Sequence, residues 1–473
     1  EGLQYETDRA RFIGRGQNLR APIAVMDGRP LSNTVGSVLD PIFSLRTRIK
    51  VAAGATEHLT FTTLVAASRQ AAADLADKYH SVTAWERVSA LAWTHAHVQL
   101  RHLRTKPDEA QLFQMLANRL IFADPSLRPA GKWMQLNTLD VSGLWRYGIS
   151  GDRPIVLLRV SEPEHRGMVD QLLRAHEYWR IKGLAVDLLI LNEKETSYVE
   201  DLQNLLENLM RESQARSAAQ EHENPGAIFV LPASRLSMEE RRLLQTAARA
   251  MLVGNRGTLA EQLLRHPRPE SAFIAPKVMP VQETEAPALA LPELEFFNGL
   301  GGFAEDGREY VIVLDKGQWT PAPWANVIAN PEFGFTVSEL GSGCTWCGNS
   351  RENQLTPWSN DPVGDTPGEV FYLRDDDSYE LWTPTALPIR VENAAYLICH
   401  GQGYSRFEHA SHGIHSELLQ FVSPDDPVKI SVLTLTNVSG RSRRLTVTAY
   451  LEWVLGASRS VTAPHIITEL DPD

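Results

Sequence analysis

A cluster of aromatic, amide and charged residues between positions 320 and 362 has the composition of a sugar-binding surface. A pyranose ring offers apolar C–H faces that stack on flat aromatic side chains, and hydroxyls that bond to amides, guanidinium groups and carboxylates. The alternative is a β-sandwich corner in which the same side chains are buried and satisfied. The predicted sugar contacts are Trp324, Arg351, Glu352, Asn353, Trp358, Asn360 and Asp361.

Other residues could also do chemistry, but their surroundings favour structural roles. Cys344 and Cys347 form a C-x-x-C pair, and with an odd total of three cysteines, reduced and unpaired thiols are favoured over a zinc site. The acidic run 375–377 could hold a metal–sugar-nucleotide complex in a glycosyltransferase, yet an acidic turn between strands is usually solvated. We therefore expect no metal and no cofactor. A zinc site at the cysteine pair would need a second pair of ligands, and the only histidines near it in the sequence are His400, His409, His412 and His415.

The composition narrows the class of partner. The chain has 473 residues, of which 43% are hydrophobic, which is enough for about three domains with separate cores. A formal net charge of −12 argues against nucleic acid and anionic membranes as partners. The sequence has no apolar run long enough to span a membrane, and its charged start is not a signal peptide. Because it begins without Met, we expect a fragment of a longer protein.

The first third of the chain changes from strand-like to helical patterning. Residues 1–67 alternate short apolar runs with turn signals and predict the later half of a β-sandwich module, with strands expected at Leu45–Val51 and Leu59–Val65. Residues 68–135 have helical periodicity and predict a helical connector. One of its helices should start at Pro107, where proline and two acidic residues suit the first turn.

Residues 136–266 predict an α/β domain, because near-continuous apolar strands alternate with amphipathic helices. A small parallel sheet wrapped by helices follows from this order. A Ser237–Glu240 capping box supports the start of the last helix. The expected strand and helix pairs are Ile155–Val160 with Pro163–Ile181, Val186–Leu191 with Ser197–Arg211, and Ile228–Leu231 with Ser237–Met251.

A proline-rich linker, residues 267–293, precedes a second β-rich region at 294–473, which predicts the first half of another β-sandwich module. The predicted fold class is therefore mixed β and α/β, with two partial sandwiches separated by the helical connector and the parallel-sheet domain. The strands expected in the second sandwich are Val311–Leu314, Phe333–Val337, Val370–Leu373, Ala395–Cys399, Leu418–Val422, Val428–Leu435 and Arg444–Leu451.

Long motifs in residues 296–473 resemble the start of the N-terminal β-sandwich of glycoside hydrolase family 94, which contains inverting phosphorylases for cellobiose and related β-glucosides. The resemblance is closest to the β-1,2-glucan branch of that family. The motifs that carry it are Asn298-Gly299, Gly301-Gly302-Phe303, Thr320-Pro-Ala-Pro-Trp324, Asn326-Val-Ile-Ala-Asn330, Asn349-Ser-Arg-Glu-Asn353, Leu355-Thr-Pro-Trp-Ser-Asn-Asp361 and the run from His400 to His409.

Residues 8 to about 80 resemble the later half of the same sandwich, through Asp8-Arg9, the run Phe12–Arg15 and the run Val38–Pro41. The two halves thus occur in reverse order. This order implies a window cut from a longer chain with two tandem sandwich modules, opening inside one module and closing inside the next.

The resemblance implies a chain without its own catalytic centre. An inverting phosphorylase needs a general acid to protonate the leaving oxygen while phosphate attacks from the opposite face. In this family the acid is an Asp in an (α/α)6 barrel after the sandwich, so we assign no catalytic residue. The expected partners are β-1,2-glucan or an oligosaccharide and the remaining domains of the parent. The expected location is the cytoplasmic side, at the inner membrane if the parent is a membrane synthase.

A second hypothesis is an interaction scaffold that positions catalytic domains elsewhere in the parent. In that case Arg351 and Glu352 are expected to form a buried ion pair rather than to bind a ligand.

Overall fold

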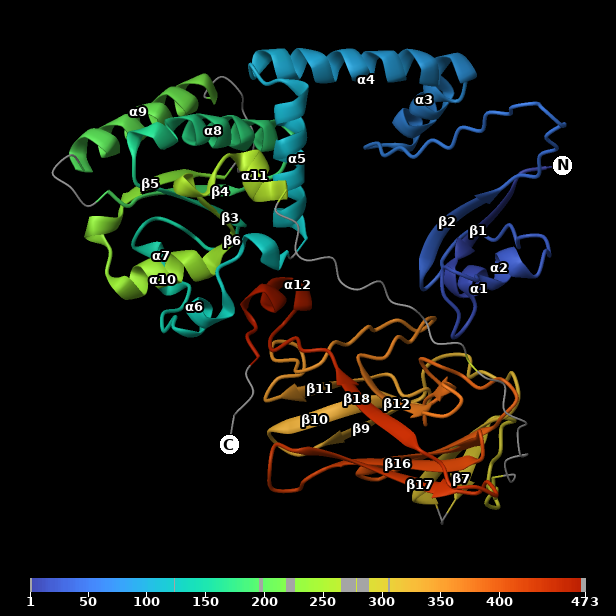
Figure 1. Cartoon of the computed structure of the whole chain (residues 1–473). Coiled ribbons are helices and arrows are strands. Elements are labelled where there is room, and N and C mark those ends of the chain that lie inside the picture. Colours follow the sequence, from blue (N-terminus) through green and yellow to red (C-terminus); the bar gives the residue numbers. More distant parts are fainter. Residues whose placement is uncertain are drawn as a thin grey trace. The chain divides into compact units, whose positions relative to one another are not determined.

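The computed structural model of the chain describes residues 2–122, 124–194, 199–217, 226–264, 278, 289–304 and 307–468 (Figure 1). Two compact units are present. Unit 1 combines Glu1–Lys50 with Phe273–Ala463, and unit 2 combines Val51–Ala272 with Pro464–Asp473. Unit 1 is therefore built from two stretches of chain that lie on either side of residues 51–272 in the sequence.

Unit 2 contains a four-stranded parallel sheet with the strand order β5-β4-β3-β6. The strands are nearly continuous apolar runs, as expected for a parallel sheet that is covered on both faces. Figure 1 shows helices on both sides of this sheet. The strands are β3 (Ile155–Val160), β4 (Asp187–Asn192), β5 (Ile228–Pro232) and β6 (Ala248–Val253).

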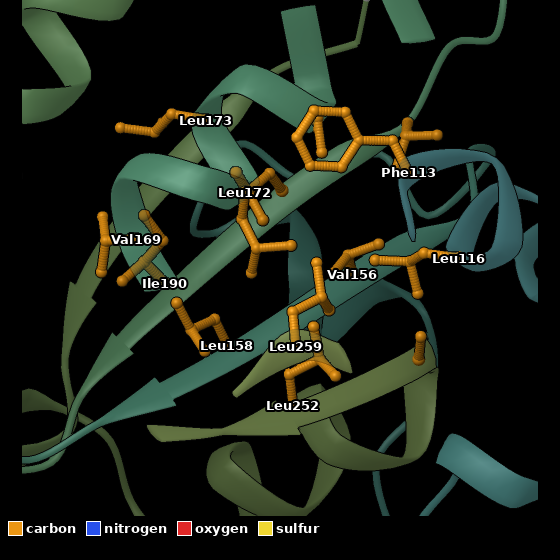
Figure 2. Close-up of a cluster of buried hydrophobic side chains, with 14 of the residues drawn as sticks. Phe113, Leu116, Val156, Leu158, Val169, Leu172, Leu173, Ile190, Leu252 and Leu259 are labelled. Atoms are coloured by element: carbon orange, nitrogen blue, oxygen red, sulfur yellow. The ribbon is translucent and has the colours of Figure 1, made fainter. Parts of the chain in front are cut away.

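Alternation along β3 divides the core of unit 2 into two layers. Val156 and Leu158 face one layer, and Ile155 and Leu157 face the other. Figure 2 shows the first layer, where Phe113 and Leu172 pack over the sheet. That layer is supplied by α5 (Pro107–Ile121), α8 (Arg166–Ile181), α9 (Val199–Ser217) and α11 (Leu259–Leu264), and the other by α7 (Ser142–Trp145) and α10 (Met238–Ala247).

In unit 2 the two predicted helix starts are confirmed, and one predicted helix end is wrong. Helix α5 begins at Pro107, and Ser237 and Glu240 form the capping box of α10. The prediction that this last helix extends to Met251 is wrong. Helix α10 ends at Ala247, because Ala248 takes extended backbone angles and begins β6, whose buried residues pair with β3.

The predicted strand Leu59–Val65 is also wrong: these residues have no strand structure and are almost all exposed. A strand forms only where its backbone groups find a partner, and alternation alone supplies none. The other helices of unit 2 are α3 (Arg69–Tyr79), α4 (Val82–His102) and α6 (Gly131–Gln135), with 3₁₀ turns at Pro125–Leu127, Pro163–His165, Ala233–Arg235 and Gly254–Arg256.

The second stretch of unit 1 forms three antiparallel sheets. The largest has the order β17-β16-β15-β14-β8-β7, and the others are β11-β10-β9 and β13-β12-β18. A short helix, α12 (Arg459–Thr462), follows them. The strands are β7 (Gly301–Ala304), β8 (Glu309–Leu314), β9 (Ala325–Ala329), β10 (Phe333–Ser338), β11 (Gly343–Cys347), β12 (Glu369–Asp375), β13 (Leu381–Trp382), β14 (Tyr396–Gly401), β15 (Tyr404–Ser411), β16 (Ile414–Val422), β17 (Lys429–Asn437) and β18 (Leu445–Leu451).

The sandwich core lies between the six-stranded sheet and β9–β11. Ile398 and Phe407 of the large sheet pack with Phe335 and Val337 of β10, and all four are buried. Each predicted strand of this region overlaps an observed one. Among the strands that the sequence did not predict, β9, β11 and β15 have apolar patterns that glycine, asparagine or charged residues interrupt.

The first stretch of unit 1 is small. It contains β1 (Gln4–Asp8), α1 (Arg9–Ile13), α2 (Ile23–Met26) and β2 (Pro41–Arg46), and β1 pairs with β2 in a two-stranded antiparallel sheet. The predicted strand at Leu45–Val51 is thus displaced, because the pairing with β1 uses residues 41–46. The mixed β and α/β fold class is confirmed. The domain limits stay a prediction, and most of the predicted linker 267–293 lies outside the described residues.

Candidate functional site

The turn after β1 places two arginines of the first stretch. Asp8 caps helix α1, because its carboxylate accepts the backbone N–H of Ala10 at 2.8 Å. Helix α1 runs for only five residues and stops at Gly14, which has a φ of 89°. Arg9 therefore lies at the start of the helix and Arg15 just beyond its end.

Arg9 forms a two-pronged ion pair with Asp361 of the second stretch. Its Nη1 and Nη2 lie 2.6 and 2.8 Å from the two carboxylate oxygens, and Nη1 also lies 2.9 Å from Asp40. The Asp361 carboxylate also accepts the backbone N–H groups of Val363 and Gly364, each at 3.0 Å. The hydrogen bond from Arg9 and these backbone bonds lower the pKa of Asp361 to about 2.

The side chain of Arg15 is more buried than that of Arg9, and its Nη2 lies 2.9 Å from Glu339 and 3.1 Å from Asp365. The Glu339 side chain is fully buried and also accepts hydrogen bonds from the Thr320 hydroxyl and from the Trp324 backbone N–H. Burial raises the pKa of Glu339. Arg15 therefore supplies the positive charge that compensates a carboxylate removed from water.

Gly16 completes the contact. Its N–H donates to the carbonyl oxygen of Val363 at 2.8 Å, and its φ is 70°. A Cβ at this position would lie 2.0 Å from the ring of Trp319, whose ring centre lies 4.3 Å from the guanidinium of Arg390. We call Arg9, Arg15 and Gly16 the clasp, and Glu339, Asp361 and Asp365 the socket.

An open cleft of about 1040 Å³ lies beside the clasp, within unit 1. Both stretches of the unit line it, and its wall mixes apolar and polar side chains. Asp361 and Arg9 belong to this wall, together with Phe12, Asn18, Arg20 and Phe43. The volume is at the upper end of the range of small-molecule sites.

The seven predicted contacts come from three places. Trp358, Asn360 and Asp361 share one loop, in which Trp358 is 57% exposed and Asn360 has a φ of 44°. Trp324, in contrast, is half-buried before β9, where its ring meets the edge of Tyr310 at a centroid distance of 5.9 Å.

The other three contacts, Arg351, Glu352 and Asn353, lie in the turn after β11. Asn349 orders this turn by accepting the backbone N–H groups of Arg351 and Glu352, each at 2.9 Å. Arg351 Nε lies 3.4 Å from Glu352, and the two side chains are 90% and 63% exposed. The buried ion pair expected from the scaffold hypothesis is therefore wrong, because this turn faces solvent.

Sequence reasoning does not select the clasp or two of its partners as site residues. Arg9 and Arg15 stand in the sequence only as parts of motifs shared with the family. Asp365 could be imagined with Asp361 as a catalytic carboxylate pair, a role that the resemblance does not give it, and nothing in the sequence points to Glu339. No spacing in the sequence links Arg15 to a carboxylate more than three hundred positions away. Membership of those motifs is therefore the one signal that could have drawn attention to the two arginines.

The remaining chemical candidates have structural partners. Cys344 is buried, and burial raises the pKa of its thiol to about 11; it and the other two cysteines are free. In the run 375–377, Asp375 pairs with Arg443, Asp376 with Arg374, and Asp377 with Arg444. Within the described ranges, no three His, Cys, Asp or Glu residues gather as a metal site.

The Arg9–Asp361 pair predicts a specific dependence on pH. Because the folded pKa of Asp361 is about 2 and its ordinary value is 3.8, the pair stabilises fully above about pH 4 and less as pH falls through 2. The difference in free energy of unfolding of unit 1 between the wild type and Asp361→Asn should therefore shrink from pH 5 toward pH 2. Urea titrations at several pH values would measure it, and a difference independent of pH would contradict the pairing.

The fold defines the class first: a β-sandwich module assembled from two stretches of chain, with the α/β unit between them in the sequence. The chain belongs to the glycosyl hydrolase 94 supersandwich domain family, which matches residues 1–82 and 308–473.

Three similar proteins extend this assignment. The cyclic beta-(1,2)-glucan synthase NdvB of Rhizobium meliloti (strain 1021) is 37% identical over 481 residues, which cover 99% of this chain and 17% of that protein. The N,N'-diacetylchitobiose phosphorylase of Vibrio proteolyticus is 30% identical over 35% of this chain and 20% of its own length. The solabiose phosphorylase of Paenibacillus borealis is 35% identical over 33% of this chain and 20% of its own length. The chain thus spans a fifth or less of each.

The resemblance to the β-1,2-glucan branch of family 94 is confirmed by these matches. In the part of the chain that the structure describes, no helix is long and apolar enough to cross a membrane.

Proposed function

We propose that this chain is a non-catalytic, glucan-binding segment of an enzyme that processes β-1,2-glucan. The observation that carries the proposal is the match over 99% of the chain to a protein named as a cyclic β-(1,2)-glucan synthase. On this proposal the catalytic acid and the phosphate site belong to other domains of the parent polypeptide, on the cytoplasmic side of the membrane.

The loop that carries Trp358, Asn360 and Asp361 supports glucan binding. Trp358 exposes more than half of its surface, so one face of its indole ring can stack on a glucose unit. Asp361 lies three positions further on and forms part of the cleft wall. A glucan chain that stacks on Trp358 can therefore continue toward the cleft, where Asn18 and Arg20 offer hydrogen-bond donors to its hydroxyls.

The turn of Arg351, Glu352 and Asn353 is proposed as a second, more polar contact. Arg351 is 90% exposed, and its Nε lies 3.4 Å from the carboxylate of Glu352. A sugar hydroxyl can compete for this pair, because an exposed ion pair contributes only about 0–1 kcal/mol. Trp324 lies at the other end of the β11-β10-β9 sheet, where its half-buried ring packs on Tyr310 and its backbone N–H bonds to Glu339, so we propose it as a separate contact.

The interaction scaffold remains as a second candidate, and the clasp is the observation that favours it. The charge pairs of Arg15 with Glu339 and Asp365 join two distant stretches of the chain within unit 1, so the partners of Arg15 there are structural and not a ligand. The two candidates differ in whether free glucan binds.

Isothermal titration of the full chain with linear β-1,2-glucan oligosaccharides tests the proposal. We expect Trp358→Ala to weaken binding about tenfold or more, because loss of one stacked ring removes on the order of 1.4 kcal/mol. The matched control is Trp93→Ala in helix α4 of unit 2, where the indole is 66% exposed but remote in sequence from the loop. Absence of binding heat at millimolar glucan would refute glucan binding and favour the interaction-scaffold hypothesis.

A further inference from the structure

The clasp and socket belong to the same family domain but to opposite ends of the chain. The family matches residues 1–82 and 308–473 as two separate stretches. Arg9 and Arg15 lie in the first stretch, and the three socket carboxylates lie in the second. All of unit 2 except its last residues separates them in sequence. The contact is thus made between two pieces of sandwich that no short connection holds together.

Charge complementarity defines the joint. Two guanidinium groups six residues apart meet three carboxylates, with four N···O distances between 2.6 and 3.1 Å. Gly16 adds a backbone hydrogen bond and lets the chain pass over the face of Trp319. Such a pattern recognises a particular segment, because it needs both charges at a fixed spacing and a residue without a side chain beside the second.

The joint can open without breaking a sheet. Among the described strands, β1 and β2 pair only with each other, and none of the three sheets of the second stretch includes them. Arginine side chains and the Gly16 N–H therefore supply hydrogen bonds between the two stretches, and a shared strand ladder does not. A segment attached in this way can leave one socket and enter an identical one with every contact restored.

We propose that the socket is an interaction surface for the clasp of a second copy of this chain, so that two chains exchange their first stretches reciprocally. Exchange of an identical element is a low-cost route to a dimer, because the closed and exchanged forms have the same contacts. The balance between them then depends on protein concentration and on the segments that connect the two stretches.

A charge-swap experiment on the full chain tests the exchange. The two variants are Arg9→Glu and Asp361→Arg, chosen because these side chains are 27% and 22% exposed, so that each chain can still fold. In either variant alone, both the closed form and the exchanged homodimer place like charges together. In an equal mixture, the exchanged heterodimer restores both pairs, because the two substituted positions meet with opposite charges in one socket and the native Arg9 meets the native Asp361 in the other.

Native mass spectrometry, with one variant carrying a mass tag, measures the heterodimer. At tens of micromolar we expect at least about tenfold more dimer in the mixture than in either variant alone, since two repulsive contacts become attractive. The double variant R9E/D361R has opposite charges at the two positions in both the closed and the exchanged form, so its dimer fraction should match that of the wild type. A mixture of Arg351→Glu with Asp361→Arg should give no heterodimer, because Arg351 lies outside the clasp.

The decisive contrary result is a mixture that stays monomeric while the double variant regains the thermal stability that each single variant loses. This would show that the Arg9–Asp361 pair forms only within one chain, and it would overturn the exchange. A cooperative calorimetric transition of unit 1, which carries both substituted positions, verifies that each variant is folded. The outcome is independent of glucan binding, because no sugar is present.

Discussion

Replacing Arg15 by Met should lower the free energy of unfolding of unit 1 by about 3–5 kcal/mol, because it leaves a buried carboxylate without its cation. The Glu339 side chain is fully buried and Arg15 is its ion-pair partner, at 2.9 Å. Met retains most of the side-chain volume, so the loss reports charge rather than a cavity. In calorimetry, the transition of unit 1 should move down by roughly 6–20 °C.

The sign of the pH dependence separates this explanation from a simple loss of packing. Burial holds the pKa of Glu339 above its ordinary value of 4.5, and removal of Arg15 should raise it further. When the pKa of a carboxyl group is higher in the folded state than in the unfolded state, the folded state becomes more stable as the pH falls from the folded-state pKa toward the unfolded-state pKa. The Arg15→Met penalty should therefore be larger at pH 8 than at pH 5, and Glu339→Gln in the same chain should recover a substantial part of it.

Arg351→Met is the matched control, since it also removes an arginine from a carboxylate pair in unit 1. Arg351 is 90% exposed, so the change in the free energy of unfolding should stay within about 0.5 kcal/mol. If Arg15→Met were as harmless as Arg351→Met at pH 8, the docking of the first stretch on the second would be contradicted.

The ion pair with Arg9 changes the role expected for Asp361, which is one of the predicted sugar contacts. The sequence suggests Asp361 as a hydrogen-bond partner for glucan, but both of its oxygens are occupied by Arg9. Its pKa of about 2 keeps it ionised and paired. Asp361 therefore holds the Trp358 loop in place, and on the proposed function glucan binding would depend on a closed clasp. Loss of Arg9 should weaken glucan binding even though Arg9 is far from Trp358 in sequence.

Local patterns predict much of the fold. The buried strands β3 and β4 are apolar runs, and the helix starts at Pro107 and Ser237 have residues typical of a first turn or a cap. Each of these elements can therefore be predicted from a few adjacent residues. The sequence does not predict strand β15, because the charged residues Arg406 and Glu408 interrupt its apolar pattern. In the structure their charged groups pair at 2.7 Å on one side of the sheet.

The site is less predictable for a physical reason. Composition indicates that a loop with Trp358 could bind sugar, and Trp358 is indeed exposed. The surroundings of Trp324 and Glu339, however, come from residues elsewhere in the sequence: Trp324 packs on Tyr310, and Glu339 pairs with Arg15. An ion pair across such a separation leaves no periodicity or spacing in the chain. The role of Arg15 can therefore be read only from three-dimensional contacts.

Gly16→Ala should destabilise unit 1 by about 2–5 kcal/mol, and it tests the clasp without changing any charge. Two terms add: about 1–2 kcal/mol for an alanine at a φ of 70°, and about 1–3 kcal/mol for overpacking against Trp319. The ring cannot move away freely, because Arg390 stacks on it with its guanidinium 4.3 Å from the ring centre. Calorimetry of the unit 1 transition measures the sum.

Gly28→Ala isolates the backbone term, because Gly28 has a φ of 67° but open space where its Cβ would be. The difference between the two variants is then the cost of the contact between residue 16 and Trp319. Because that contact exists only while the first stretch is docked, Gly16→Ala should also release the stretch and increase hydrogen exchange at the backbone N–H of residue 16. Equal destabilisation by the two substitutions, with unchanged exchange, would mean that the clasp is not closed in solution.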